Sequence, residues 1–274
     1  MWAVLRTAVD KWFEHRTTRL GAALAYYSVF SLGPLLLIIV TVAGLFFGRD
    51  EVRESLTAQL RDLLGAIGSQ AVEAMLKGAG SEQTGIWAAI LGAVLLVAAA
   101  VGVVAQLKDA LNTIWEVEAE PHGGWWPFFR SYLVSLSGVL ALGFLLSVSL
   151  VLSAGLTAFS NWLGISAGAN LFWQGVNFAV SLGVLAGLFA LLFHYFPDAD
   201  VAWADVWAPA LATSVLFNAG KLAIAWYIGT QGLESTYGAA ASVVVLLIWV
   251  YYSSQILLFG AELSHASAIH RSKK

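Results

Sequence analysis

Apolar residues dominate six long stretches of the chain, and each is long enough to cross a bilayer as a helix. A spanning helix needs about 20 mainly apolar residues. The stretches are residues 20–47, 85–107, 131–159, 172–196, 206–228 and 238–263. The pattern predicts an all-α, polytopic membrane protein with six transmembrane helices that form a single integral-membrane domain over residues 1–274.

The segment between the first two stretches, residues 48–84, has a different pattern. Its apolar residues recur every three or four positions, as Leu56, Leu60, Leu63 and Ile67 do. This period is helical, and charged residues occupy the other face. We expect an external amphipathic helical loop that lies on the membrane surface or caps the bundle. A packed cap and a lid that moves both fit this pattern.

The first stretch contains "GAALAYYSVFSLGPLL", which has two glycines, two tyrosines, two serines and a proline. Small residues let helices approach closely, and a proline frees a backbone carbonyl that needs another donor. We therefore expect a kink in the first span near Gly33 and Pro34.

Composition supports the membrane assignment and excludes several classes. The chain is 59% apolar and only 11% charged, whereas about a quarter of the residues of a soluble domain are charged. Its net charge is −3, so it lacks the basic excess of a nucleic-acid-binding domain. It has no cysteine, which excludes disulfides and thiolate metal sites. The charged N-terminus does not resemble a cleaved signal peptide.

Basic residues predict the orientation of the bundle. Six spans place both termini on one side, and nine lysines and arginines lie on that side. The opposite side has four, all in the loop 48–84, together with six carboxylates. The positive-inside rule then places the N- and C-termini in the cytoplasm.

Polar side chains within the spans form two layers. In hydrocarbon such groups must face protein or water, so residues from several helices at one depth are a candidate cavity lining. Hydrogen bonds between helices explain the same pattern without a ligand. The cytoplasmic layer includes Tyr26, Tyr27, Ser31, Asn112, Gln255 and Glu262, and the outer layer includes Asn177, Asn218 and Lys221.

Lys221 lies in the apolar segment "LFNAGKLAIAWYI". A lysine at the bilayer centre costs about 2.5–3.5 kcal/mol on insertion scales. Its long side chain can extend to the interface, or it can face inward and meet an anionic group. Both interpretations remain open.

Two further acidic groups lie at cytoplasmic helix ends. Asp109 follows Lys108, and Glu262 precedes His265 by three residues. Solvated interfacial anchors are the ordinary explanation for charges at such positions. Glu262 also lies within one turn of the apolar run "LLFGA", so an inward-facing role is a second interpretation.

Four blocks of the sequence resemble the YihY/BrkB family of bacterial inner-membrane proteins, the group named for virulence factor BrkB and once labelled ribonuclease BN. The blocks are "ALAYYSVFSLGPLLLI", "ALNTIW" (110–115), "HYFPDADVAWADVWAPALATSVLFNAGKLAIAWYI" (194–228) and "YGAAASVVVLLIWVYYSSQILLFGAEL" (237–263). The resemblance implies six spans with cytoplasmic termini in the bacterial inner membrane. The positions that match the family pattern are Tyr26, Tyr27, Ser31, Pro34, Asn112, Trp115, Pro197, Lys221, Tyr237, Gly238, Gly260 and Glu262.

The sequence does not favour an enzyme. A phosphodiesterase needs a metal cluster or an acid–base pair beside a basic groove, but the five histidines are scattered. No "GxxxxGK[ST]" loop is present, which argues against an ATPase on this chain. We expect no catalytic residue, no metal and no cofactor.

We therefore expect a transporter-like or flippase-like protein that binds an anionic or lipid-like substrate. Lys221, Asn218 and Asn177 would contact it in the outer half, the cytoplasmic layer would line the inner half, and Glu262 or Asp109 would couple protons. The alternative is a non-transporting scaffold for cell-envelope assembly. The expected partners are the lipid bilayer and the substrate, and small residues on several spans also allow a homo-oligomer.

Overall fold

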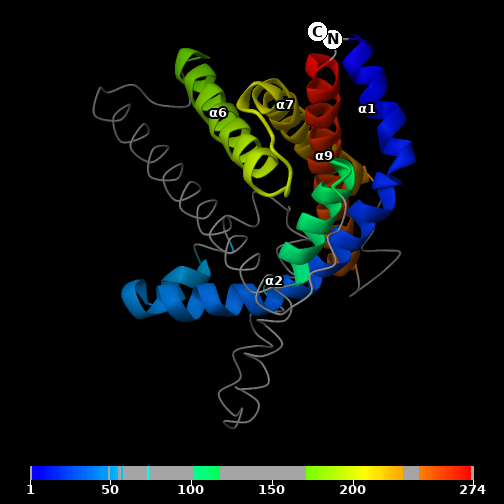
Figure 1. Cartoon of the computed structure of the whole chain (residues 1–274). Helices are drawn as coiled ribbons and strands as arrows, with labels where there is room; N and C mark the ends of the chain where they lie inside the picture. The colour runs from blue at the N-terminus through cyan, green and yellow to red at the C-terminus, as the bar shows by residue number, and fades with distance from the viewer. Residues whose placement is uncertain are drawn as a thin grey trace. The chain divides into compact units, whose positions relative to one another are not determined.

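The computed structural model describes residues 2–48, 50–54, 57, 73, 102–117, 171–230 and 241–272. Within these ranges the side chains of residues 32–39, 41–47, 171–174, 177, 221, 225–230, 241 and 242 are not described. All regular secondary structure in the described residues is helical (Figure 1). For this part of the chain the all-α prediction is confirmed.

Five labelled helices are described. They are α1 (Trp2–Glu14), α2 (Thr17–Phe47), α6 (Leu171–Tyr195), α7 (Trp203–Thr230) and α9 (Ala241–Ser272). An unlabelled helix covers residues 102–114. The predicted stretches 20–47, 172–196 and 206–228 coincide closely with α2, α6 and α7, whereas α9 continues past residue 263. The stretch 131–159, most of 85–107 and most of the loop 48–84 lie outside the described residues.

Two helices are long and apolar enough to cross a membrane, among the residues that the structure describes. The segments are Phe178–Tyr195 and Val243–Ser272. Only 28% and 33% of these segments are buried, whereas the core helix of a soluble protein is mostly covered. Open apolar surface of this kind fits a lipid environment better than water. The six-span arrangement stays a prediction.

The first predicted span forms one helix. α2 runs from Thr17 to Phe47 and passes through Gly33 and Pro34 without ending. The expected kink near these two residues stays a prediction.

The described chain divides into two compact units. The first contains Met1–Thr17, Lys108–Asn218 and Ile256–Lys274. Its core is formed by α1, helix 102–114, α6, the first part of α7 and the last part of α9. The apolar side chains that are fully buried there include Ala8, Leu111, Ile114, Phe193, Val206 and Leu258.

Helix ends and polar contacts fix the connection between α6 and α7 in this first unit. α6 ends at Tyr195, two residues before Pro197, which lacks the backbone N–H that a regular helix needs. The backbone N–H of Asp198 donates to Asn112 Oδ1 at 2.8 Å, and Asn112 Nδ2 donates to Asp198 Oδ2 at 2.9 Å. Lys108 Nζ lies 2.8 Å from Asp198 Oδ1. These contacts attach residues 196–202 to helix 102–114.

The second unit contains Thr18–Leu107 and Ala219–Gln255. Glycines allow its helices to approach closely. A Cβ at Gly102 would lie 3.0 Å from the ring of Tyr27, and one at Gly220 would overlap the Tyr252 ring. Small residues at such crossings are typical of helices that pack in a membrane.

Candidate functional site

The first unit contains a carboxylate with no exposure to solvent. Glu262 of α9 has a relative side-chain exposure of 0%. The Thr17 hydroxyl donates to Glu262 Oε1 at 2.8 Å, and His15 Nδ1 lies 3.1 Å from the same oxygen. Glu262 Oε2 has no hydrogen-bond partner among the described residues. Since a carboxylate normally accepts several hydrogen bonds, one side of Glu262 is unsatisfied.

The turn between α1 and α2 places His15 and Thr17 against Glu262. α1 ends at Glu14, and Arg16 adopts a left-handed backbone conformation with φ of 53°. The backbone N–H of Arg16 donates to the carbonyl of Phe13 at 3.2 Å, which closes the last turn of α1. α2 then begins at Thr17, which is completely buried. The chain therefore presents both side chains from a tight two-residue turn.

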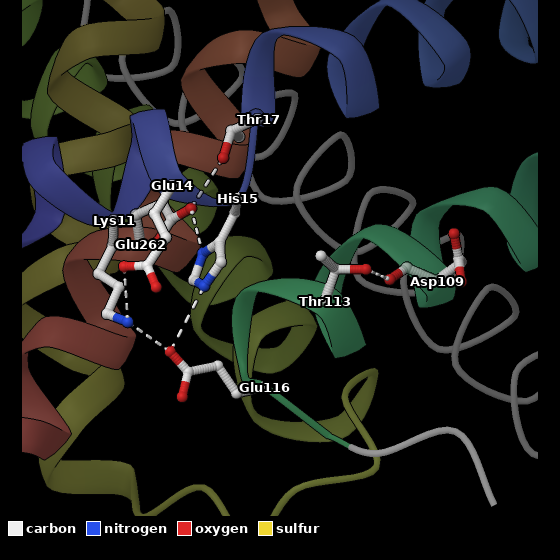
Figure 2. Close-up of polar contacts among 8 residues, drawn as sticks. All are labelled: Lys11, Glu14, His15, Thr17, Asp109, Thr113, Glu116 and Glu262. Atoms are coloured by element: carbon white, nitrogen blue, oxygen red, sulfur yellow. Dashed lines mark hydrogen bonds and ion pairs between the residues drawn. The ribbon is translucent and has the colours of Figure 1, made fainter.

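A second carboxylate continues the contacts toward the surface. His15 Nε2 lies 3.4 Å from Glu116 Oε1, and Lys11 Nζ lies 2.6 Å from the same oxygen. Lys11 also pairs with Glu14 Oε2 at 2.9 Å. Figure 2 shows the His15 ring between the Glu262 and Glu116 carboxylates, with Lys11 beside Glu116. We call Lys11, His15, Thr17, Glu116 and Glu262 the Glu262 cluster.

At the outer end of this cluster, the ion pair between Lys11 and Glu116 shifts the pKa values of both side chains. The hydrogen bond from Lys11 lowers the pKa of Glu116 below its usual value, although partial desolvation acts in the opposite direction. The hydrogen bond to Glu116 is also the main reason why the pKa of Lys11 is raised. Both groups therefore stay charged over a wider pH range than they would in isolation.

His265 forms the remaining wall of the cluster. It lies one turn after Glu262 on α9 and is 8% exposed. Its ring stacks on that of His15 at a centroid distance of 6.3 Å, and the Trp115 ring lies 5.1 Å away on a tilted plane. The aromatic rings of His15, His265 and Trp115 therefore lie together beside the buried carboxylate.

The chemistry that the contacts of this cluster allow is proton exchange between a carboxylate and an imidazole. Within the described ranges, no group of three or more His, Asp or Glu side chains has the arrangement of a metal site. A buried carboxylate that contacts an imidazole can exist as an ion pair or as a neutral pair. The two forms differ only in the position of one proton.

Asn112, Asn218 and Asp109 of the first unit lie outside the Glu262 cluster. Asn112 is bonded to Asp198, as described above. Asn218 Nδ2 donates to the Ser214 carbonyl of its own helix at 2.9 Å. Asp109 is exposed, as expected of an interfacial anchor. The interpretation of Glu262 as a solvated anchor is wrong, because its side chain is completely buried against His15 and Thr17.

In the second unit the predicted residues make local contacts. The rings of Tyr26 and Tyr27 meet edge to face at 5.8 Å, and both side chains are largely open. Ser31 Oγ donates to the Ser28 carbonyl at 2.9 Å. Gln255 Nε2 donates to the backbone carbonyl at position 18 at 3.3 Å. The Lys221 and Asn177 side chains fall outside the described residues, so their predicted roles remain predictions.

Sequence reasoning missed His15, Thr17, Lys11 and Glu116 as parts of the site. They precede the first predicted span or follow helix 102–114, where polar residues are expected at a surface. The i, i+3 spacing of Glu262 and His265 was a usable signal, since it places two ionisable groups on one helix face.

A family profile described as "Virulence factor BrkB" matches residues 8–274 of the chain. A UPF0761 membrane protein of Aggregatibacter aphrophilus is 26% identical over 268 residues, which cover 95% of this chain and 90% of that protein. A UPF0761 membrane protein of Legionella pneumophila is 26% identical, over 98% of this chain and 63% of that protein.

A third UPF0761 membrane protein, from Methylibium petroleiphilum, is 34% identical over 62% of this chain and 40% of that protein. The aligned part of the chain thus spans 40% of the Methylibium relative and 63% of the Legionella relative. No solved structure matches the chain.

Proposed function

The chain belongs to the virulence factor BrkB family of membrane proteins, and we propose that it transports an anionic or lipid-like substrate across the bacterial inner membrane without an ATPase of its own. The relatives' printed names call them membrane proteins and give no activity. The proposal therefore depends on the chemistry of this chain, and it assigns no catalytic reaction.

The observation that carries the proposal is the buried carboxylate of Glu262. An ionised group taken out of water costs several kcal/mol unless its partners compensate. A scaffold gains nothing from this arrangement that apolar packing would not supply, whereas a transporter uses a protonatable group that switches between charged and neutral forms. In this proposal Glu262 is the group that couples protons to substrate movement.

The substrate contacts in the proposal are the two predicted polar layers. In the outer half, Lys221 of the second unit supplies the positive charge that meets an anionic headgroup or a small anion. Tyr26, Tyr27, Ser31 and Gln255 of the same unit line the inner half. The predicted polar residues of the first unit are Asn112, Asn177 and Asn218. Both termini lie in the cytoplasm, so protons reach Glu262 from that side.

The alternative function is a non-transporting scaffold for envelope assembly. Two observations favour it. The polar groups of Ser31 and Asn218 bond to carbonyls of their own helices, as expected if they only satisfy the membrane interior. Asn112 attaches a loop to a helix, which is a structural role.

Reconstituted vesicles distinguish the two functions. The full chain is placed in phosphatidylethanolamine and phosphatidylglycerol vesicles that contain a trace of fluorescent phosphatidylglycerol, and its transfer between leaflets is followed by quenching with dithionite. Uptake of radiolabelled phosphate tests a small anion in the same vesicles. Mass spectrometry identifies the lipids that copurify with the protein.

Variants then assign the contacts. Lys221→Met removes the charge and keeps most of the stem, and Lys108→Met is the matched control outside the predicted spans. We expect Lys221→Met to abolish anionic lipid transfer or phosphate uptake, and Lys108→Met to retain it. If the native protein inserts correctly yet moves neither probe and copurifies with no anionic lipid, the transport proposal is wrong and the scaffold is favoured.

A further inference from the structure

A continuous line of ionisable side chains connects the buried Glu262 to the surface of the first unit. Glu262 is 0% exposed and contacts His15, which is 9% exposed, and His15 contacts Glu116, which is 51% exposed. Lys11 and Glu14 continue the contacts beyond Glu116. An apolar substitution at His15 would break the line between Glu262 and the surface.

The central element of this line is suited to proton transfer. The His15 imidazole has two nitrogens, each of which can take up or release a proton. Nδ1 lies 3.1 Å from Glu262 Oε1, and Nε2 lies 3.4 Å from Glu116 Oε1. One ring therefore contacts the buried carboxylate with one nitrogen and the exposed carboxylate with the other.

We propose that Glu116, His15 and Glu262 form a proton relay that loads and unloads the buried carboxylate from one surface of the protein. This inference rests on the proposed function, because it supplies the proton pathway that a coupled transporter needs. It assigns His15 and Glu116 as relay residues and the proton as their ligand.

The loading step balances without any other reactant. A proton from solvent binds Glu116 and passes to His15 Nε2, while the proton on His15 Nδ1 passes to Glu262 Oε1. Glu116 is again a carboxylate, His15 is the other neutral tautomer and Glu262 is a carboxylic acid. Unloading reverses each transfer and restores the first tautomer, so a relay used in both directions needs no ring flip.

The unpartnered oxygen of Glu262 supports this assignment independently of the line of contacts. Oε2 is buried and has no hydrogen-bond partner among the described residues. A fixed carboxylate with a purely structural role would satisfy both oxygens. While Oε1 exchanges the proton with His15, the free Oε2 can accept a hydrogen bond from a substrate group.

Backbone geometry holds His15 and Glu116 in place. Arg16 and Glu116 are the two non-glycine residues with positive φ in the described part of the chain, both at 53°. Arg16 directly follows His15. At the end of helix 102–114, the N–H groups of Glu116 and Val117 donate to the carbonyls of Thr113 and Asn112. In this C-terminal motif glycine is the usual residue at the position of Glu116.

The other charged groups around the relay modulate it. From α1, Lys11 contacts Glu116 and Glu14, and it keeps Glu116 ionised so that a bound proton passes on quickly. From α9, His265 stacks on the relay imidazole. Two other polar groups near the end of α9 have partners outside the relay. Arg271 Nη2 lies 2.6 Å from Asp205 Oδ2 of α7, and His270 Nε2 lies 3.1 Å from Thr7 Oγ1.

Infrared difference spectroscopy tests the relay directly. The full chain in nanodiscs is subjected to a rapid pH change, and the C=O stretch of protonated carboxylic acids is followed with time. Glu262→Gln assigns the band of Glu262. The rate at which this band appears is then compared in the native protein, Glu116→Gln, His15→Gln and Glu14→Gln. Glu14 is the matched control, because its described contact is with Lys11 and not with His15 or Glu262.

We expect Glu116→Gln and His15→Gln to lower the rate at which the Glu262 band appears by at least about tenfold, as the removal of a positioned acid–base group does. Glu14→Gln should leave this rate unchanged. An equal rate in the native protein and Glu116→Gln, or a band that Glu262→Gln does not remove, would overturn the relay. The outcome is separate from the flux assay. Normal flux with unchanged band kinetics rejects the relay alone, and the expected kinetics without flux reject transport alone.

Discussion

Replacing His15 by leucine tests whether the Glu262 cluster is energetically coupled. The substitution removes the imidazole that lies 3.1 Å from Glu262 Oε1 and keeps an apolar side chain at a site that is 9% exposed. Glu262 is then left with the Thr17 hydroxyl as its described partner. We expect the free energy of unfolding to fall substantially, because a buried charge loses its main compensation.

The size of this loss follows from two limits. Leaving a buried charge without its partner costs about 3–5 kcal/mol. The isolated carboxylate can also escape by taking up a proton, which costs about 3.7 kcal/mol at pH 7 for a glutamate with an ordinary pKa of about 4.3. The variant adopts whichever of these two states costs less free energy. We therefore expect His15→Leu to lower the free energy of unfolding at pH 7 by about 3–4 kcal/mol.

A double-mutant cycle measures the coupling. Unfolding of the native protein, His15→Leu, Glu262→Met and the double variant is followed by tryptophan fluorescence in detergent micelles. The double variant removes charge and partner together, and paired replacement by apolar residues is often neutral. We expect it to be more stable than His15→Leu by at least about 2 kcal/mol.

A hydrogen bond between α1 and α9 outside the Glu262 cluster provides the control. Thr7 Oγ1 lies 3.1 Å from His270 Nε2, and Thr7→Val should cost only about 1 kcal/mol, as a typical hydrogen bond does. If the effects of His15→Leu and Glu262→Met instead add within about 0.5 kcal/mol, as at independent sites, the reasoning about a coupled buried carboxylate is refuted.

Three further predictions concern the packing and the charges around the site. A Cβ at Gly260 would lie 2.7 Å from Phe193 Cζ, so Gly260→Ala should lower the free energy of unfolding by about 1–3 kcal/mol. Gly183→Ala is the control, because no described atom lies within 4 Å of a Cβ there, and it should not lower stability. An equal loss for both variants in thermal unfolding would contradict this packing argument. The Lys11–Glu116 pair stabilises the fold above the ordinary carboxyl pKa of 4.5, and this contribution is lost as pH falls through the lowered pKa of Glu116 or rises through the raised pKa of Lys11. Because Glu116 is 51% exposed, Lys11→Met should remove less than about 1 kcal/mol of acid-sensitive stability, and an unchanged acid melting profile would argue against the pair. Asn112→Ala should speed amide hydrogen exchange in residues 196–202, because it removes both bonds to Asp198; unchanged exchange there would show that other contacts hold this segment.

Much of the helical structure was predictable because its cause is local. The length of the apolar runs predicted α2, α6 and α7 nearly at their observed bounds, and the gap between the runs 172–196 and 206–228 matches the break between α6 and α7. α9 was predicted too short, because its last turns alternate polar and small residues that do not read as a membrane span. These last turns contact α1, as the hydrogen bond between Thr7 and His270 shows.

The candidate site was only partly predictable, because its contacts are distant in sequence. Glu262 was identified from its position at the end of an apolar run, but its partners His15 and Thr17 lie 247 and 245 positions away. A single sequence contains no signal for such pairs. The N-terminal helix carries charges on much of its surface, so nothing in it indicated that His15, which directly follows it, would contact Glu262 of α9.

The central claim is that protonation of Glu262 drives substrate movement, and flux under an imposed pH gradient tests it most directly. Vesicles with the native protein or Glu262→Gln are prepared with equal pH, an acid exterior or an acid interior, and transfer of fluorescent phosphatidylglycerol and uptake of labelled phosphate are measured. The account predicts that the sign of the gradient changes the native flux severalfold and has no effect on Glu262→Gln. Native flux that ignores the gradient, or a Glu262→Gln variant that still responds to it, would contradict the account.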